Sequence, residues 1–150
     1  YGFQAEGSDL SADMVAVALE NCPKDIADRV TAFQTSAFAI DMEDCAVDSI
    51  FSMRLMHHIG QSEHRLEMLK EFHRVTKDTV ILSLWVDGNF KARKRIKSEE
   101  RHPRGVNQNR FVIPANQIEQ EFAATGFDVV KHLDFIPYYA MWRVYVLRKN

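Results

Sequence analysis

The chain has 150 residues, of which 46% are hydrophobic and 27% charged, and its formal net charge is −2 at pH 7. This composition excludes a disordered chain and predicts one globular domain over residues 1–150. There is no run of about 18 apolar residues and no charged-then-apolar leader, so we expect a cytoplasmic protein with no membrane partner. The low net charge gives no general attraction to nucleic acid, and Cys22 and Cys45 lack zinc or disulfide spacing.

The first third of the chain predicts two short strands joined by a helix, followed by a third strand. Residues 3–8 form a short bounded segment, and Ser11 is an N-cap candidate for a helix whose apolar positions lie within residues 14–19. Residues 30–34 and 47–52 are apolar runs of strand length.

An acidic residue stands where the first strand passes into the first helix. Asp9 should therefore lie at the carboxyl end of a strand. In open α/β sheets this edge binds nucleotide-like ligands, and an acid there accepts hydrogen bonds from both ribose hydroxyls. Aspartate before a helix is also a common cap or turn residue, so the position alone leaves both roles open.

A longer helix and a buried strand follow. Ser62 is an N-cap candidate, and the helix after it has a periodic apolar face made of Leu66, Leu69, Phe72 and Val75. Residues 79–86 are rich in β-branched and aromatic side chains with little alternation, which is typical of a parallel strand covered by helices.

The chain then passes through a basic stretch into a last helix and a hairpin. Residues 87–110 lose the apolar pattern, and we expect an irregular excursion outside the sheet. Pro114 suits a first helical position and Gly126 a position just past a helix end. Residues 127–135 and 139–147 predict two antiparallel strands. The alternation of strands and helices predicts an α/β layered fold.

Four ordered blocks carry a family resemblance. They are Gly-Ser-Asp-Leu-Ser-Ala-Asp-Met at 7–14, Val-Asp-Ser-Ile-Phe-Ser and Leu-Met-His-His-Ile within 47–59, the helix over 66–77, and Ala-Thr-Gly-Phe at 124–127. In these blocks the chain resembles the small standalone domains of class I S-adenosylmethionine-dependent methyltransferases. The resemblance implies a Rossmann-like sheet of order 3-2-1-4-5-7-6, helices on both faces, a C-terminal antiparallel hairpin and methyl transfer from S-adenosylmethionine to a small-molecule acceptor.

The resemblance also implies site residues. It assigns Asp9 to the ribose hydroxyls, Leu10 to the side of the adenine, and Ser36 and Ala37 to the adenine edge. Met53 and Arg54 would line the methionine moiety and the substrate. Ser36 departs from the family, which commonly has an acid there, and residues 77–79 lack its Pro-Gly-Gly turn.

The family's first strand and its glycine-rich loop have no counterpart, because no Gly-x-Gly-x-Gly occurs in the sequence. One hydrogen bond from a charged group contributes roughly 1.5 to 3 kcal/mol, whereas micromolar binding needs about 8 kcal/mol. We therefore expect residues 1–150 to be the downstream portion of a larger domain, binding the cofactor poorly alone. The alternatives are a shortened fold completed by strand exchange or a homodimer, and a non-catalytic interaction or oligomerisation module.

Two adjacent histidines are the weak catalytic candidates. His57 or His58 could act as general base, since an unperturbed imidazole pKa near 6.5 suits proton removal at neutral pH. Either could instead be a loop residue that packs or caps, and many methyl transfers need no base. No metal ligand set is recognised. Arg54, His58 and the basic residues of 87–110 leave room for an anionic acceptor under a substrate-side lid. A solvated helix is the favoured interpretation of that segment, and nucleic-acid binding, which the net charge does not favour, is the remaining alternative.

Overall fold

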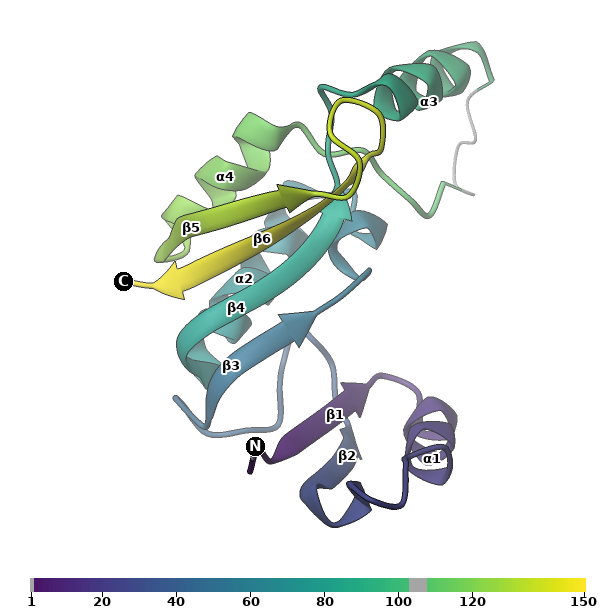
Figure 1. Cartoon of the computed structure of the whole chain (residues 1–150). Coiled ribbons are helices and arrows are strands. Elements are labelled where there is room, and N and C mark those ends of the chain that lie inside the picture. The colour runs from purple at the N-terminus through teal and green to yellow at the C-terminus, as the bar shows by residue number, and fades with distance from the viewer. Residues whose placement is uncertain (1, 103–107) are drawn as a thin grey trace. The chain divides into compact units, whose positions relative to one another are not determined.

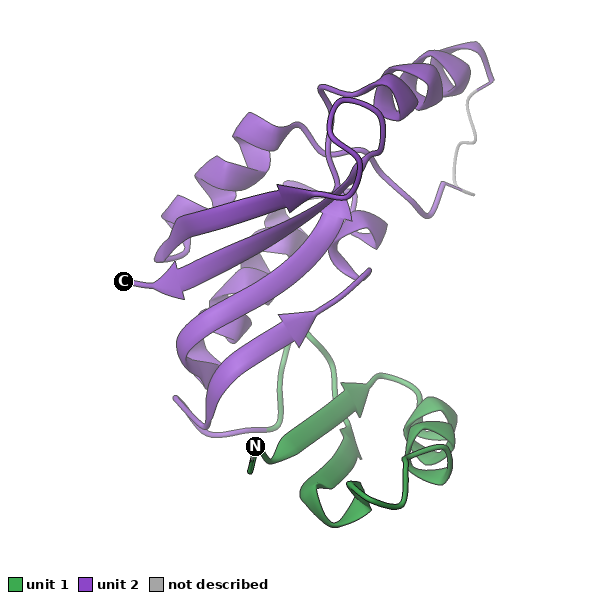
Figure 2. Ribbon diagram, in the orientation of Figure 1, with its two compact units in different colours: residues 1–41 green, residues 42–150 purple. Residues whose placement is uncertain are grey.

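The structure is a computed structural model that describes residues 2–102 and 108–150 (Figure 1). Two compact units make up the chain, residues 1–41 and 42–150, and each is described by itself (Figure 2). The described strands form two sheets, one in each unit. The first has two strands and the second has four.

The first unit is a parallel strand pair with its crossover helix. Strand β1 (Ala5–Asp9) pairs with β2 (Val30–Gln34), and between them lie α1 (Ala12–Glu20) and the short helix η1 (Ala27–Arg29). Ser11 is the N-cap of α1, as predicted, since its hydroxyl accepts a hydrogen bond from the backbone N–H of Met14 at 3.4 Å. Because β1 ends at Asp9, the prediction that this residue lies at the carboxyl end of a strand is confirmed.

The first unit buries little apolar surface. Helix α1 has no buried residue, and every residue of β1 is exposed. Large apolar side chains are between 43% and 76% exposed, namely Phe3, Leu10, Met14, Val17, Leu19 and Phe38. Since apolar burial contributes about 25 cal/mol per Å², this unit gains little stability from a core of its own.

The second unit contains the core of the protein. Its sheet has the order β3-β4-β6-β5, formed by β3 (Val47–Ser52), β4 (Thr76–Trp85), β6 (Trp142–Lys149) and β5 (Phe127–Asp134). Strands β3 and β4 are parallel, whereas β6 runs antiparallel to both of its neighbours. The predicted C-terminal hairpin is thus confirmed.

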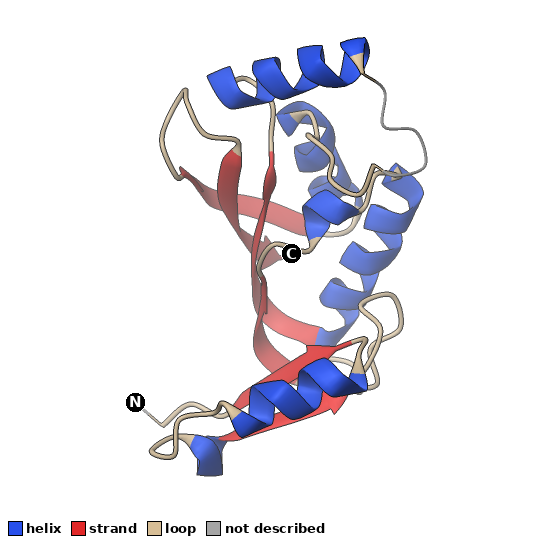
Figure 3. Cartoon of the chain, turned by 90° about the vertical axis from the view of Figure 1, so that its right-hand side faces the viewer, coloured by secondary structure: helices blue, strands red, loops and turns tan. Residues whose placement is uncertain are grey.

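Helices α2 (Ser62–Val75) and α4 (Ala115–Ala124) contact each other and cover one face of this sheet (Figure 3). Gly126 follows α4 with φ = +84°, the left-handed conformation expected just past a helix end. An added Cβ there would lie 2.7 Å from His73 Nε2, so a side chain would be both strained and crowded. The core lies between helices and sheet and includes Met68, Leu69, Phe72, Val80, Leu82, Leu84, Ile118, Phe122, Tyr145 and Leu147.

Part of the basic excursion is the solvated helix that the sequence favoured for it, although the loss of the apolar pattern had also indicated an irregular segment. Residues 90–101 form α3 (Phe90–Arg101), whose only buried side chain is that of Ala92. A helix with one buried residue shows no apolar periodicity, which is why the pattern lapses there. Local chemistry forms it instead, because Asn89 caps its first turn and Arg95 lies four residues before Glu99.

A buried ion pair joins α2 to α4. The Arg65 and Glu121 side chains are only 2% and 6% exposed, and Arg65 donates from Nε and Nη2 to both carboxylate oxygens at 2.8 and 2.6 Å. Arg65 Nη1 also donates to the carbonyls of Ile59 and Gly60, and Ser62 donates to Glu121 at 2.7 Å. Burial raises the pKa of Glu121, but these hydrogen bonds outweigh burial and lower it overall. The apolar face predicted for α2 is therefore interrupted by a charge, and Leu66 is only half buried.

One edge of each sheet lacks a partner where the expected order has an additional strand. Among the described residues β1 pairs only with β2, and β3 pairs only with β4. Unpaired backbone N–H and C=O groups along such an edge are available for pairing with another strand.

We expect either half of the buried ion pair to be intolerant of loss on its own. Arg65→Met or Glu121→Leu should each lower the free energy of unfolding by about 3–5 kcal/mol, because the remaining charge would be buried without a partner. The double variant should recover part of that loss. Urea unfolding measures the free energy of unfolding of each variant. Lys77→Met is the control, because the Lys77–Asp48 pair is exposed and its loss should change stability by less than about 1 kcal/mol. Single variants no less stable than the control would contradict this role.

Candidate active site

The cofactor-side residues of the first unit lie at one edge of the parallel strand pair. The Asp9 carboxylate accepts a hydrogen bond through Oδ1 from the backbone N–H of Ser11 at 2.8 Å. Its other oxygen, Oδ2, has no hydrogen-bond partner among the described residues, and the side chain is exposed. Asp9 therefore serves as a turn residue and keeps one carboxylate oxygen for a ligand, so the two roles left open by the sequence are compatible.

Neighbouring positions at this edge come from both strands. The Gln34 side-chain amide donates to the Leu10 carbonyl at 2.9 Å, which fixes the backbone beyond β1, while the Leu10 side chain is 71% exposed. Ser36 and Ala37 follow β2 and are half buried. The Ser36 hydroxyl accepts from the backbone N–H of Phe38 at 3.2 Å, so it helps to form the turn after β2.

In the second unit, Met53, predicted to line the methionine moiety, and Arg54, predicted on the substrate side, both follow β3. Met53 is 52% exposed, and Arg54 adopts φ = +65°, a conformation that non-glycine residues rarely take. The Arg54 backbone N–H donates to the hydroxyl of Ser83 on β4 at 2.9 Å. Such backbone strain, of order 1–3 kcal/mol, persists where surrounding structure imposes it and is common at functional sites.

The two histidines have different environments. His58 is exposed, and its Nδ1 lies 2.6 Å from the carbonyl oxygen of Asn109. Since a carbonyl only accepts hydrogen bonds, Nδ1 carries the proton and the lone pair of the neutral ring is on Nε2. His58 thus has the geometry of a base held by its second nitrogen.

His57 is buried, and burial together with nearby positive charges keeps its imidazole neutral. It belongs to the short helix η2 (Met56–His58), is 2% exposed, and stacks on Trp85 with ring centroids 4.7 Å apart. Trp142 meets the same imidazole edge-on at 4.9 Å. Burial, followed by the charges of His58 and three arginines, lowers the pKa of His57 to about 4. An imidazole with that pKa is a poor proton acceptor at neutral pH, so His57 packs rather than acting as a base.

Three guanidinium groups surround this aromatic cluster. Arg95 Cζ lies 4.7 Å and Arg110 Cζ 5.9 Å from the Trp85 ring centroid, and Arg54 Cζ lies 5.9 Å from that of Trp142. We call Arg54, Arg95, Arg110, His57, Trp85 and Trp142 the arginine–tryptophan cluster. Sequence reasoning found Arg54 and His57, and it included Arg95 and Arg110 only as part of the basic segment. It missed Trp85 and Trp142 as site residues, because members that are far apart in the chain share no local pattern.

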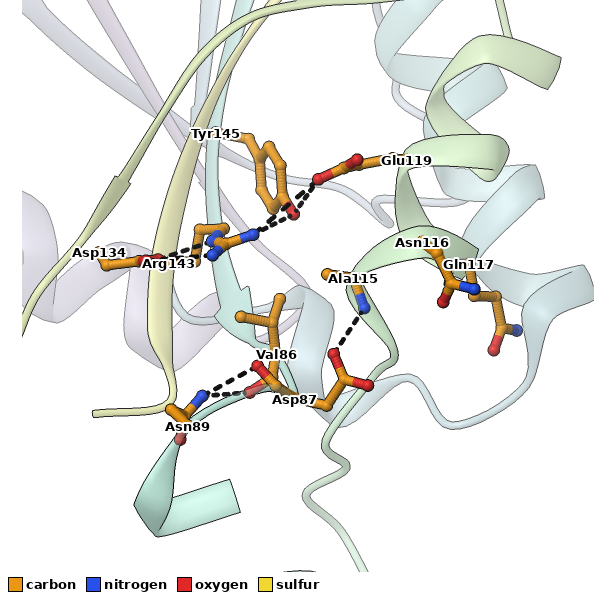
Figure 4. A network of polar contacts seen from close by, with 10 residues as sticks. All are labelled: Val86, Asp87, Asn89, Ala115, Asn116, Gln117, Glu119, Asp134, Arg143 and Tyr145. Carbon is orange, nitrogen blue, oxygen red and sulfur yellow. Dashed lines mark hydrogen bonds and ion pairs between the residues drawn. The ribbon is translucent and has the colours of Figure 1, made fainter. Parts of the chain in front are cut away.

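Hydrogen bonds hold the loop between β4 and α3 in place (Figure 4). The buried Asn89 amide donates to the carbonyls of Val86 and Asp87 at 2.8 and 3.1 Å, and its oxygen caps α3 through Ala92. The Asp87 carboxylate accepts from the backbone N–H of Ala115 at 3.0 Å and so fixes the start of α4. This loop determines where α3, and with it Arg95, begins.

A second polar group in Figure 4 stabilises the hairpin and lies outside the cluster. Arg143 pairs with Asp134 at 2.6 Å, and the Tyr145 hydroxyl donates to Glu119 at 2.9 Å. Burial raises the pKa of Tyr145 to about 12, so its phenol stays protonated at neutral pH. These residues serve to pack the sheet against α4.

A shallow cleft of about 440 Å³ runs along α3. Its lining residues are Phe90, Lys91, Lys94, Arg95, Ser98, Glu99, Tyr139 and Met141. Phe90 and Tyr139 stack with centroids 5.8 Å apart and planes inclined by 6°. Arg95 belongs to both the cleft and the arginine–tryptophan cluster, so the two features adjoin within the second unit.

Residues 2–102 and 108–150 hold no group of three or more His, Cys, Asp or Glu side chains arranged for a metal ion. No helix within the same ranges has the length and apolar character needed to cross a membrane.

Comparison with known proteins assigns the family. A profile of methyltransferase domains matches residues 1–79, more than half of the chain. The chain belongs to the methyltransferase domain family. No curated protein sequence matches it.

Solved structures establish the fold. Magnesium protoporphyrin IX methyltransferase from Synechocystis, with bound SAH, has a TM-score of 0.77 at 15% identity, covering 98% of this chain and 64% of that chain. An S-adenosylmethionine-dependent methyltransferase from Methanosarcina mazei gives 0.78 at 12% identity, with 99% and 82% covered. Geranyl diphosphate methyltransferase in complex with SAM gives 0.71 at 10% identity, with 100% and 70% covered. The predicted Rossmann-like methyltransferase fold is thus confirmed, and the chain spans less than two thirds of the first of these relatives.

The lowered pKa of His57 predicts a specific loss of stability in acid. Between the unfolded value of 6.5 and the folded value of about 4, the unfolded chain binds the proton and the folded chain does not. The free energy of unfolding should therefore fall as the pH drops through this interval, by up to about 3 kcal/mol from this residue. Urea unfolding of the wild type and His57→Phe at pH 7, 5.5 and 4 measures it. The wild type should lose more stability than the variant, and parallel curves would contradict the assignment.

Proposed function

We propose that this methyltransferase domain transfers a methyl group from S-adenosylmethionine to a small-molecule acceptor. The observation that carries the proposal is the Asp9 carboxylate, which ends β1 inside the family-matched region and keeps Oδ2 available at the carboxyl edge of a parallel strand pair. At such an edge an acid accepts hydrogen bonds from a ribose diol.

The residues at this edge fit the nucleoside in chemistry. Asp9 would accept hydrogen bonds from the ribose hydroxyls, and the exposed Leu10 side chain would cover one face of the adenine. Ser36 and Ala37 would lie along the adenine edge. Met53 belongs to the second unit, and we propose for it the role at the methionine moiety that the resemblance implies. When bound, S-adenosylmethionine supplies an electrophilic methyl group on a sulfonium. The contribution of these residues is to bind and align, which suffices for an in-line displacement by a reactive acceptor.

On the acceptor side, we assign binding to Arg54 and His58. Two structural relatives are named for small-molecule substrates, magnesium protoporphyrin IX and geranyl diphosphate. These names support a small-molecule acceptor for this chain. For an acceptor that must lose a proton, His58 Nε2 would take it, because Nδ1 is held by the Asn109 carbonyl. Residues 87–110, which include α3, would cover the acceptor as a lid.

Further contacts are needed for tight cofactor binding. The sequence contains no Gly-x-Gly-x-Gly, and one charged hydrogen bond from Asp9 falls well short of the roughly 8 kcal/mol of micromolar affinity. We propose that a strand from outside these 150 residues, from the same or another chain, completes the domain. The unpaired edges of β1 and β3 support this proposal.

Loss of the Asp9 charge should weaken nucleoside binding selectively. Asp9→Asn keeps an oxygen for the Ser11 N–H but removes the negative charge. We expect the dissociation constant for S-adenosylhomocysteine to rise about 10- to 100-fold, from the strength of a charged hydrogen bond. Calorimetry measures it, and Asp28→Asn is the matched control, since Asp28 is an exposed acid of the same unit. Equal affinities of Asp9→Asn and the control would remove the role of Asp9.

A broader result would reject the function itself. No heat from either S-adenosylmethionine or S-adenosylhomocysteine at about 1 mM, equivalent to less than roughly 4 kcal/mol of binding, would favour the non-catalytic interaction module.

A further inference from the structure

We propose that the arginine–tryptophan cluster binds an acidic group, a carboxylate or a phosphate, on a planar organic molecule whose body lies in the adjoining cleft along α3. This inference rests on the proposed function only in identifying that molecule as the methyl acceptor. The binding site itself is built from residues of the second unit alone.

The first argument is an imbalance of charge. Arg54, Arg95 and Arg110 all lie within 6 Å of an indole centroid, and Glu99 is the only acid that contacts any of them among the described residues. Arg95 Nε lies 2.9 Å from Glu99 Oε1, yet neither atom makes a hydrogen bond with proper geometry. Glu99 therefore pairs with Arg95, while Arg54 and Arg110 have no acidic partner among the described residues.

Arginines elsewhere in the same unit are paired differently. Arg65 is bound by Glu121, Arg143 by Asp134, and Arg74 by both Glu71 and Asp44. In these places the fold provides a carboxylate at 2.6 to 2.9 Å for each guanidinium. Arg54 and Arg110, which lie over the two indoles, have no such carboxylate among the described residues, and an external anion would supply one.

The second argument is a surplus of donors. The Trp85 side chain is more than nine-tenths buried, and its indole Nε1–H, which can only donate, has no hydrogen-bond partner among the described residues. An indole nitrogen and a guanidinium only donate, so they cannot satisfy one another. A buried donor without a partner costs about 1–3 kcal/mol. A carboxylate or phosphate, which carries several acceptor lone pairs, is the group that this surplus fits.

The third argument is preorganisation. A guanidinium held over an indole ring keeps its N–H donors in a planar fork. The geometry of this fork matches that of a carboxylate or a phosphate. Arg54 is also held by its backbone, with φ = +65° and a hydrogen bond to Ser83. Little side-chain entropy would then be lost on binding.

The adjoining cleft suggests the shape of the rest of the molecule. Its volume of about 440 Å³ is within the range of small-ligand sites, and Arg95 connects it to the cluster. Phe90 and Tyr139 are 57% and 46% exposed, and both line it. Exposed aromatic faces beside a cationic group favour a planar, unsaturated body bearing an acid.

Tryptophan fluorescence reports on this site alone. The chain has two tryptophans, Trp85 and Trp142, and both belong to the cluster. We would titrate the protein, without any nucleoside, with benzoate, phenyl phosphate and the uncharged control benzamide. Saturable quenching by benzoate, by phenyl phosphate or by both is expected, with benzamide at least about tenfold weaker, as for loss of a charged hydrogen bond.

Matched variants test the residues. Arg54→Gln and Arg110→Gln should each weaken binding of the anionic probe about tenfold or more. Both side chains are exposed, so the variants should fold, which circular dichroism checks. Arg101→Gln on α3 removes the same charge from an exposed position outside the cluster and should change affinity less than about twofold.

Each outcome has a defined meaning. Binding of phenyl phosphate alone identifies phosphate, and binding of benzoate alone identifies carboxylate. Equal quenching by benzamide, an equal loss in Arg101→Gln, or no saturable change with any probe up to about 10 mM, equivalent to under roughly 3 kcal/mol, would overturn the proposal. Since no nucleoside is present, these results are independent of the calorimetry that tests methyl transfer.

Discussion

The buried ion pair between Arg65 and Glu121 is the interaction on which the second unit depends. It ties α2 to α4, and through the carbonyls of Ile59 and Gly60 it also holds the turn that follows η2. His57 lies on that short helix, and its carbonyl accepts from the backbone N–H of Phe111 at 2.8 Å. The Phe111 ring in turn fills the space beside Gly60, where an added Cβ would approach it to 2.6 Å. Helix packing and the geometry of the candidate site are therefore set by one desolvated charge pair.

The same unit uses arginine in two ways. Where arginine holds elements together, as at Arg65, Arg74 and Arg143, a carboxylate of the chain lies within 2.9 Å. Where the carboxyl ends of β3 and β4 meet, the Arg54 and Arg110 guanidinium groups lie over tryptophan rings, and no acid pairs with them among the described residues. Charges satisfied internally add to stability, whereas charges without an internal acid are available to a ligand. This contrast separates the structural arginines from those proposed to bind.

The first unit has a different physical character. Its strand pair and helix bury no side chain fully, and β1 leaves one edge unpaired among the described residues. An exposed parallel strand edge and an exposed apolar helix face are stabilised by contact with further protein surface. The unit that carries Asp9 is therefore also the one with the least core of its own.

The sequence by itself determined most elements, the hairpin and the end position of Asp9, because caps, apolar runs and glycine act over a few neighbouring residues. It favoured a solvated helix for the segment of α3 but could not give its bounds, because a single buried residue leaves no periodicity. It could not place Arg65 in the core, since a charge is buried only when a distant acid meets it. Only the tertiary structure decided that His57 is a packed, neutral ring while His58 keeps a free Nε2, and that Arg95 and Arg110 join Arg54 around two indoles. Burial and charge environment depend on residues far apart in the chain, which no local pattern records.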